Sequence, residues 1–239
     1  MDLCRRIESA IDLLDQLQEQ AGAGASGVGA GGALLANLHD QLEHLRLDAR
    51  DADLRLGLLE LLVPTRDLDA SLIAALHYLM ERFDVEAAGM RLREGDDFPY
   101  FSTRGFSNEF VVAESSLCHR DAQGCPTQDP SGLANLECMC GAVILGQTDP
   151  SAPFFTPGGS FWTNSSTDLL ATGLADEGSV HVRGRCNRDG YESVALVPLR
   201  SGGQTFGLVQ LNDRRRGRFD LGTITLLEDL VEHVARVLG

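Results

Sequence analysis

The feature that most constrains this chain is an apolar repeat that runs without a break from Leu35 to Val63. Its apolar residues recur at alternating steps of three and four, which is the seven-residue period of a coiled coil. Asp, Glu and Arg fill the positions between them, and Pro64 ends the run because proline cannot continue a helical hydrogen-bond ladder. The repeat predicts a coiled-coil helix over residues 34–64 that joins two copies in a homodimer. The alternative is an amphipathic helix packed against its own domain.

Two shorter segments precede this helix. Residues 1–20 carry apolar side chains at helical spacing (Leu3, Ile7, Ala10, Leu14 and Leu17), which predicts an N-terminal amphipathic helix. Residues 21–33 are rich in glycine, which gives the backbone high conformational entropy and offers no side chains to pack. We therefore expect a flexible linker between two helices of an N-terminal stalk.

Residues 67–239 show the alternation expected of a compact α+β domain. Apolar spacing predicts a helix over residues 68–83, followed by two strands within residues 85–94 and 98–106. Residues 107–185 are irregular and rich in Gly, Pro, Ser and Thr. Two apolar, β-branched runs at residues 191–200 and 205–213 flank a Gly-Gly turn and predict a hairpin, and residues 224–238 predict a final helix.

Charge and motifs exclude several functions. The chain of 239 residues has 20 basic and 35 acidic residues, so its net charge of −15 argues against binding to nucleic acid or anionic membranes. No apolar run reaches the length of a membrane span and the N-terminus has no signal-peptide pattern, so we expect a cytoplasmic protein. The chain has no Lys and no nucleophile elbow, zinc-hydrolase, kinase or dinucleotide motif, so we expect no enzymatic activity.

The order helix, two strands, variable segment, hairpin and helix resembles the GAF family over roughly residues 68–238. The resemblance is carried by the two strands of the hairpin and by the last helix with the loop before it (Pro198, Leu199, Gly207, Phe219, Leu227 and Val234). It implies a GAF-like antiparallel sheet with helices on one side and a small-ligand pocket on the other, roofed by the variable segment. The family's bilin-binding and cyclic-nucleotide-binding motifs are absent, and the latter needs a Lys.

The resemblance implies a cytosolic sensory or regulatory domain in signal transduction. Such domains bind tetrapyrroles, haem, iron or small metabolites, and they act through an output domain such as a kinase, which here is a separate or missing part. The family also includes dimerisation and interaction modules that bind no ligand, and this reading stays open as the alternative.

Five of the six cysteines fall between residues 118 and 186. In a reducing compartment, clustered cysteines indicate a metal site or redox chemistry rather than structural disulfides. A tetrahedral zinc ion or an iron–sulfur cluster needs four thiolates, so the predicted metal ligands are Cys118, Cys138, Cys140 and Cys186. Arginines 183, 185 and 188 are expected to lower the thiolate pKa values.

Other readings of the cysteines stay open. His119 can replace one thiolate, Cys125 lies in a polar turn, and Cys4 lies on the first helix away from the others. The cysteines can also form a thiol redox switch, or they can be small apolar residues of the core.

A second candidate site is the aromatic and polar run around the single Trp. Trp162, Thr163 and Asn164 are expected to line a ligand pocket, because they combine an aromatic surface with hydrogen-bonding groups. In the alternative reading the aromatic side chains complete the core, and Ser166 or Thr167 caps a short helix.

Overall fold

The computed structural model describes residues 2–22, 30–63, 67–129, 132, 134–173 and 182–239. The chain divides into two compact units, residues 1–60 and residues 61–239. None of the helices within the described ranges is both long and apolar enough to span a membrane.

The N-terminal unit contains two long helices, α1 (Asp2–Gly22) and α2 (Ala30–Leu61). They run antiparallel, because Cys4 hydrogen-bonds to Asp53 and the ring of His39 lies 3.3 Å from the carboxylate of Asp15. Most of the predicted glycine-rich linker, residues 23–29, lies outside the described residues, whereas residues 30–33 belong to α2.

The predicted heptad stripe of α2 lies largely on the exposed side of the helix. Leu38, Leu45 and Leu56 are 43%, 53% and 58% exposed. The buried leucines of this helix and of the turn that follows it are Leu54, Leu58 and Leu62, spaced four residues apart on another face. Most of the stripe that we assigned to a dimer seam is therefore exposed, whereas Leu35, Leu42 and Ala49 are half-buried.

The C-terminal unit is built on a five-stranded antiparallel sheet in the order β2-β1-β5-β4-β3. The strands are β1 (Ala87–Leu92), β2 (Tyr100–Arg104), β3 (Phe161–Thr163), β4 (Ser193–Ser201) and β5 (Gln204–Asp213). The β4–β5 hairpin turns at Gly202 and Gly203, whose φ angles of 57° and 78° are the positive values that a tight two-residue turn requires. The predicted α+β class and antiparallel sheet are confirmed.

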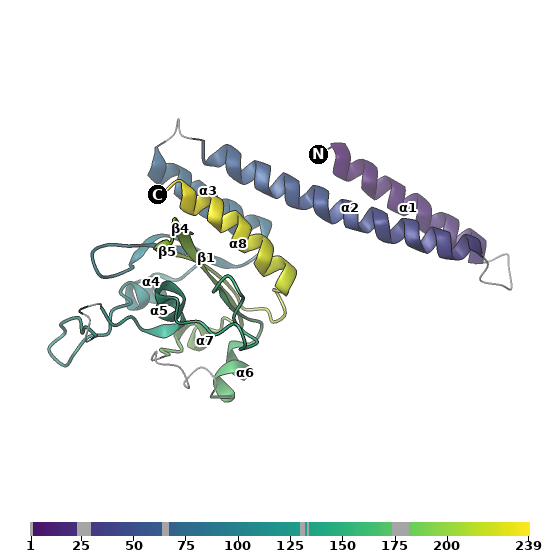
Figure 1. The fold of residues 1–239 in the computed structure, drawn as a ribbon. Coiled ribbons are helices and arrows are strands. Elements are labelled where there is room, and N and C mark those ends of the chain that lie inside the picture. Colours follow the sequence, from purple (N-terminus) through teal and green to yellow (C-terminus); the bar gives the residue numbers. More distant parts are fainter. Residues whose placement is uncertain (1, 23–29, 64–66, 130–131, 133, 174–181) are drawn as a thin grey trace. The chain divides into compact units, whose positions relative to one another are not determined.

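Helices cover both faces of this sheet (Figure 1). One face carries α3 (Leu68–Arg82) and α8 (Leu221–Arg236), which contact β1 and β4 respectively. The other face carries α4 (Asn108–Glu114) and α5 (Cys138–Leu145), with α6 (Ser166–Ala171) and α7 (Arg185–Arg188) beyond them. Because side chains alternate along a strand, β4 supplies Val194 and Leu196 to the α5 face.

Candidate functional site

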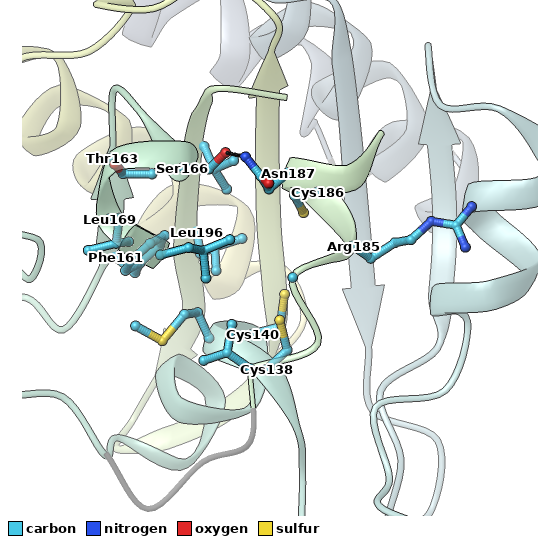
Figure 2. Close-up of a pocket in the computed structure, with 15 residues that line it drawn as sticks. Cys138, Cys140, Phe161, Thr163, Ser166, Leu169, Arg185, Cys186, Asn187 and Leu196 are labelled. Atoms are coloured by element: carbon cyan, nitrogen blue, oxygen red, sulfur yellow. Dashed lines mark hydrogen bonds between the residues drawn. The ribbon is translucent and has the colours of Figure 1, made fainter. Parts of the chain in front are cut away.

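A cleft opens on the sheet face that carries α5, opposite α3 and α8 (Figure 2). Phe161 of β3 with Val194 and Leu196 of β4 form its buried floor, and these side chains are 2–4% exposed. Helix α6 supplies Leu169 and Leu170, which are half-buried at the rim. Its enclosed space is small, about 60 Å³. This is well below the ~300–1,000 Å³ of sites that enclose a whole small molecule, so the cleft has room for one group of a ligand.

Three cysteines line one end of the cleft: Cys138 and Cys140 from α5, and Cys186 from α7. Figure 2 shows the sulfur atoms of Cys138 and Cys140 next to each other, with Cys186 on the segment that passes above them. Cys140 is buried, whereas Cys138 and Cys186 are half-buried. Cys138, Cys140 and Cys186 therefore line the same cleft, although the sequence separates them by up to 48 positions.

The start of α5 has an unusual backbone. Cys138 has a φ of 65°, a left-handed backbone conformation that residues other than glycine seldom adopt. The helix is held close to the preceding chain at Gly141, where an added Cβ would lie 2.8 Å from the backbone carbonyl carbon of Leu136. Strain of this kind persists only where the surroundings fix it, and it is common at functional sites.

Hydrogen bonds give Cys138 the character of a thiolate. The thiol of Cys140 donates to the Cys138 sulfur, and the backbone N–H groups of Arg183 and Met139 donate to it as well. These bonds outweigh the opposing effect of burial and lower the pKa of Cys138 from 9.0 to about 6. The lowered pKa favours the thiolate form of Cys138, which is the form in which a cysteine is reactive.

The other two thiols stay protonated. The hydrogen bond to Cys138, together with burial, raises the pKa of Cys140 well above its usual value. Burial raises the pKa of Cys186 to about 12. Gln210 lies beneath Cys186 and donates a hydrogen bond of 3.6 Å to its sulfur, while accepting one of 2.8 Å from the hydroxyl of Tyr100. A protonated Cys186 is thus held in a fixed place by the sheet.

The arginines near the cysteines act differently from our expectation. The Arg183 guanidinium donates to Glu137 at 2.6 Å, and that of Arg185 donates to Asp189 at 2.8 Å. Arg188 donates to the backbone carbonyl of Arg183 at 2.7 Å. Arg183 lowers the pKa of Cys138 through its backbone N–H. This contact depends on the path of the chain, so the number of nearby arginines in the sequence does not reveal it.

A buried arginine that the sequence reasoning missed lies behind the thiols. Arg91 of β1 is 1% exposed and donates to the carbonyls of Phe98, Ser115 and Glu114 at 3.0, 3.1 and 2.6 Å. Its guanidinium also lies 3.6 Å from the centre of the Tyr100 ring. The positive charge opposes the rise in the pKa values of Cys140 and Cys186. Arg91 thus ties the strand to the chain around the cleft and places a cation beside its sulfurs.

The fourth predicted metal ligand lies elsewhere. Cys118 does not line the cleft, and its thiol lies 3.7 Å from the carbonyl of Asp96, with its pKa raised to about 11, mainly by burial. The ring of His119 hydrogen-bonds to Thr127 at 2.9 Å, Cys125 is exposed, and Cys4 lies in the other unit. No group of three or more His, Cys, Asp or Glu side chains in the described ranges is arranged to hold a metal ion. The zinc or iron–sulfur site stays a prediction without support from this geometry.

The second predicted site is only partly at the cleft. Thr163 lines it, whereas Asn164 is engaged with the chain before α8, donating to the carbonyl of Phe219 at 2.6 Å and accepting from its N–H at 2.9 Å. Trp162 pairs with Ala195 in the sheet and is half-buried. The short helix that we expected here begins one residue earlier than predicted: Ser165 is its cap and accepts from the N–H of Asp168 at 3.1 Å.

Comparison with known proteins identifies the fold. A family model described as GAF domain matches residues 67–238. A GAF domain of a phosphoenolpyruvate-protein phosphotransferase from Coxiella burnetii superposes with a TM-score of 0.54 at 11% identity, covering 80% of this chain and 93% of that one. No curated protein matches the sequence.

Two further solved structures bear on catalysis. One is fRMsr of Staphylococcus aureus in complex with substrate (TM-score 0.52, 14% identity, covering 79% of this chain and 95% of that chain). The other is free methionine-R-sulfoxide reductase from Neisseria meningitidis in complex with its substrate (TM-score 0.50, 14% identity, covering 78% and 87%).

These neighbours overturn one expectation from the sequence. We expected no enzymatic activity because hydrolase, kinase and dinucleotide motifs are absent, but this inference is wrong, since the same fold serves as a reductase. Motifs of other folds say nothing about catalysis in this one. The family match over residues 67–238, together with the five-stranded sheet, shows that the chain belongs to the GAF domain family.

Proposed function

We propose that this GAF domain is a regulatory domain in signalling whose input is the oxidation state of a dithiol, Cys138 and Cys140. One observation carries the proposal: the sulfur atoms of Cys138 and Cys140 lie next to each other at the end of a cleft (Figure 2). A thiolate attacks an oxidant to form a sulfenic acid, and a neighbouring thiol converts that acid to a disulfide with release of water. The two cysteines supply both partners.

The position of the pair offers a route for the signal. The cysteines form the first turn of α5, which packs against β4 and β5. The opposite side of β4 contacts α8. A disulfide between Cys138 and Cys140 has a specific geometry, so forming it requires the backbone in the first turn of α5 to move. The left-handed φ of Cys138 and the close packing at Gly141 leave little room to absorb this movement within the turn. We infer that this change is passed through the sheet to α8 and from there to an output protein.

A second function is favoured by the reductase neighbours. The cleft would then bind a small sulfoxide and transfer its oxygen to Cys138, so that each sulfoxide and two thiols give one sulfide, one disulfide and water. In that case the dithiol is a catalyst rather than a sensor. The apolar floor of the cleft favours a sulfoxide with an apolar substituent.

Turnover separates the two functions. The reduced protein is incubated with methionine sulfoxide or methyl phenyl sulfoxide and dithiothreitol, and the sulfide formed is measured over time. For a sensor we expect less than one equivalent of sulfide per protein. Many equivalents, lost in Cys138→Ser and retained in Cys125→Ser, would replace the sensor by the reductase.

We further propose that the exposed stripe of α2 joins two copies of the chain. A charged side chain in a dimer seam cannot be buried without a large desolvation cost, so Leu45→Glu should give a monomer. Leu47→Glu is the matched control, because Leu47 is 49% exposed but lies outside the heptad stripe. Sedimentation at tens of micromolar tests both variants. A monomeric wild-type protein, or equal effects of the two substitutions, would contradict the dimer.

A further inference from the structure

We propose that the oxidant of this site is an organic hydroperoxide whose carbon group binds in the apolar part of the cleft while its peroxide group reaches Cys138. This inference rests on the proposed function and names the class of molecule that the dithiol detects. Its basis is the asymmetry of the cleft: the sulfurs lie at one end, and Phe161, Leu169 and Leu196 lie together at the other (Figure 2).

The walls of the cleft suit a carbon group better than a polar one. Its floor residues Phe161, Val194 and Leu196 are buried aromatic and branched aliphatic side chains, and α6 adds two half-buried leucines. An apolar substituent that displaces water from these surfaces gains binding energy in proportion to the area covered. Hydrogen peroxide has no such substituent and gains nothing from these walls.

The polar groups at the cleft are already engaged. Ser166 donates to the carbonyl of Tyr191 at 2.6 Å, and Asn187 donates to the hydroxyls of Ser166 and Thr167 at 3.0 and 2.7 Å. The hydroxyl of Thr163 accepts from the N–H of Ser165 at 3.2 Å. These bonds hold α6 and α7 in place and leave the apolar walls as the main recognition surface.

The thiols complete the chemistry. The Cys138 thiolate attacks the terminal peroxide oxygen, the O–O bond breaks, and the leaving alkoxide takes the proton of the Cys140 thiol to leave as an alcohol. Cys138 is now a sulfenic acid and Cys140 a thiolate. The Cys140 thiolate then attacks the Cys138 sulfur, the S–O bond breaks, and hydroxide leaves as water after taking a proton from solvent. Two thiol sulfurs are oxidised, one peroxide is reduced, and the products are a disulfide, an alcohol and water.

Rates of oxidation test the inference. The full chain carrying Cys4→Ser and Cys125→Ser is reduced and mixed with cumene hydroperoxide, tert-butyl hydroperoxide or hydrogen peroxide. Loss of the free thiols of Cys138 and Cys140 is followed by alkylation and mass spectrometry, and each rate is divided by the rate of the same oxidant with N-acetylcysteine. We expect the corrected rate for cumene hydroperoxide to exceed that for hydrogen peroxide by about tenfold or more, as hydrophobic pockets discriminate by that amount.

Variants at the rim separate recognition from chemistry. Leu169→Asn and Leu170→Asn should lower the rate with cumene hydroperoxide several-fold more than the rate with hydrogen peroxide, and so remove most of this preference. Leu145→Asn should keep it, because Leu145 lies on α5 but does not line the cleft. Equal corrected rates for all three oxidants, or a rim variant that slows them all alike, would overturn the inference and leave the dithiol sensor standing. No oxidation of the pair by any peroxide would overturn both.

Discussion

Cys138→Ser is expected to remove the fast thiol of this protein, slowing the first alkylation of a Cys4→Ser, Cys125→Ser background by about a hundredfold or more at pH 6.5. With a pKa of about 6, Cys138 is mostly thiolate at this pH. Cys118 and Cys186, with pKa values of about 11 and 12, hold less than about one part in ten thousand as thiolate. The greater nucleophilicity of a more basic thiolate recovers only part of that difference.

The dependence on pH and on Cys140 gives this prediction its controls. The rate for the unmodified pair should rise to half its plateau near pH 6 and stay flat above pH 7, because the thiolate, not the thiol, reacts. Cys140→Ser keeps a hydroxyl donor and should leave the midpoint low, whereas Cys140→Ala removes the donor and should raise it. Iodoacetamide kinetics with mass-spectrometric mapping measure all three. A midpoint near pH 9, or equal midpoints for the two variants, would contradict the assignment.

Arg91→Met is expected to lower the free energy of unfolding by about 3–5 kcal/mol, the cost of leaving buried polar partners without their charged donor. Arg91 is 1% exposed, and its loss leaves the carbonyls of Phe98, Ser115 and Glu114 without the bonds that it makes. Methionine fills much of the volume of the arginine side chain, so the expected loss of stability comes from the missing hydrogen bonds and not from a cavity.

Urea unfolding measures this effect, and Arg93→Met is its matched control. Arg93 lies just beyond the same strand, is exposed, and donates to the carbonyl of Gly95 at 3.1 Å. A change within about 0.5 kcal/mol is expected there, as for most surface substitutions. If Arg91→Met unfolds within 1 kcal/mol of the wild type, the three carbonyl bonds do not hold the chain around the cleft.

The elements that could be predicted from the sequence are those with a local, periodic signal. The β4–β5 hairpin carries β-branched runs around two glycines, and α8 shows apolar residues on one helical face. Helices α4 and α5 were missed in a segment that looked irregular. Helix α4 has only seven residues, and α5 is apolar all round, so neither displays a period. The cap Ser107, which accepts from the N–H of Phe110, was the signal for α4.

Some of the residues that line the cleft could be picked out from the sequence, but their surroundings could not. Clustering of cysteines indicated Cys138, Cys140 and Cys186, but a four-ligand template added Cys118, which the chain path places beside Asp96. The positive φ of Cys138 and the Arg183 N–H that reaches its sulfur arise from tertiary structure. No residue pattern encodes such a contact, so the surroundings of the cysteines were not visible in the sequence.

Peptide mapping of the oxidised protein tests the central claim most directly. The full chain is treated with one equivalent of peroxide, blocked with iodoacetamide without reduction, and digested. The dithiol account predicts that the peptide containing Cys138, Met139 and Cys140 is lighter by two hydrogens and carries no alkyl label, while Cys118 and Cys186 are labelled on denaturation. Full labelling of Cys138 and Cys140, with oxidation confined to Cys4 and Cys125, would contradict it.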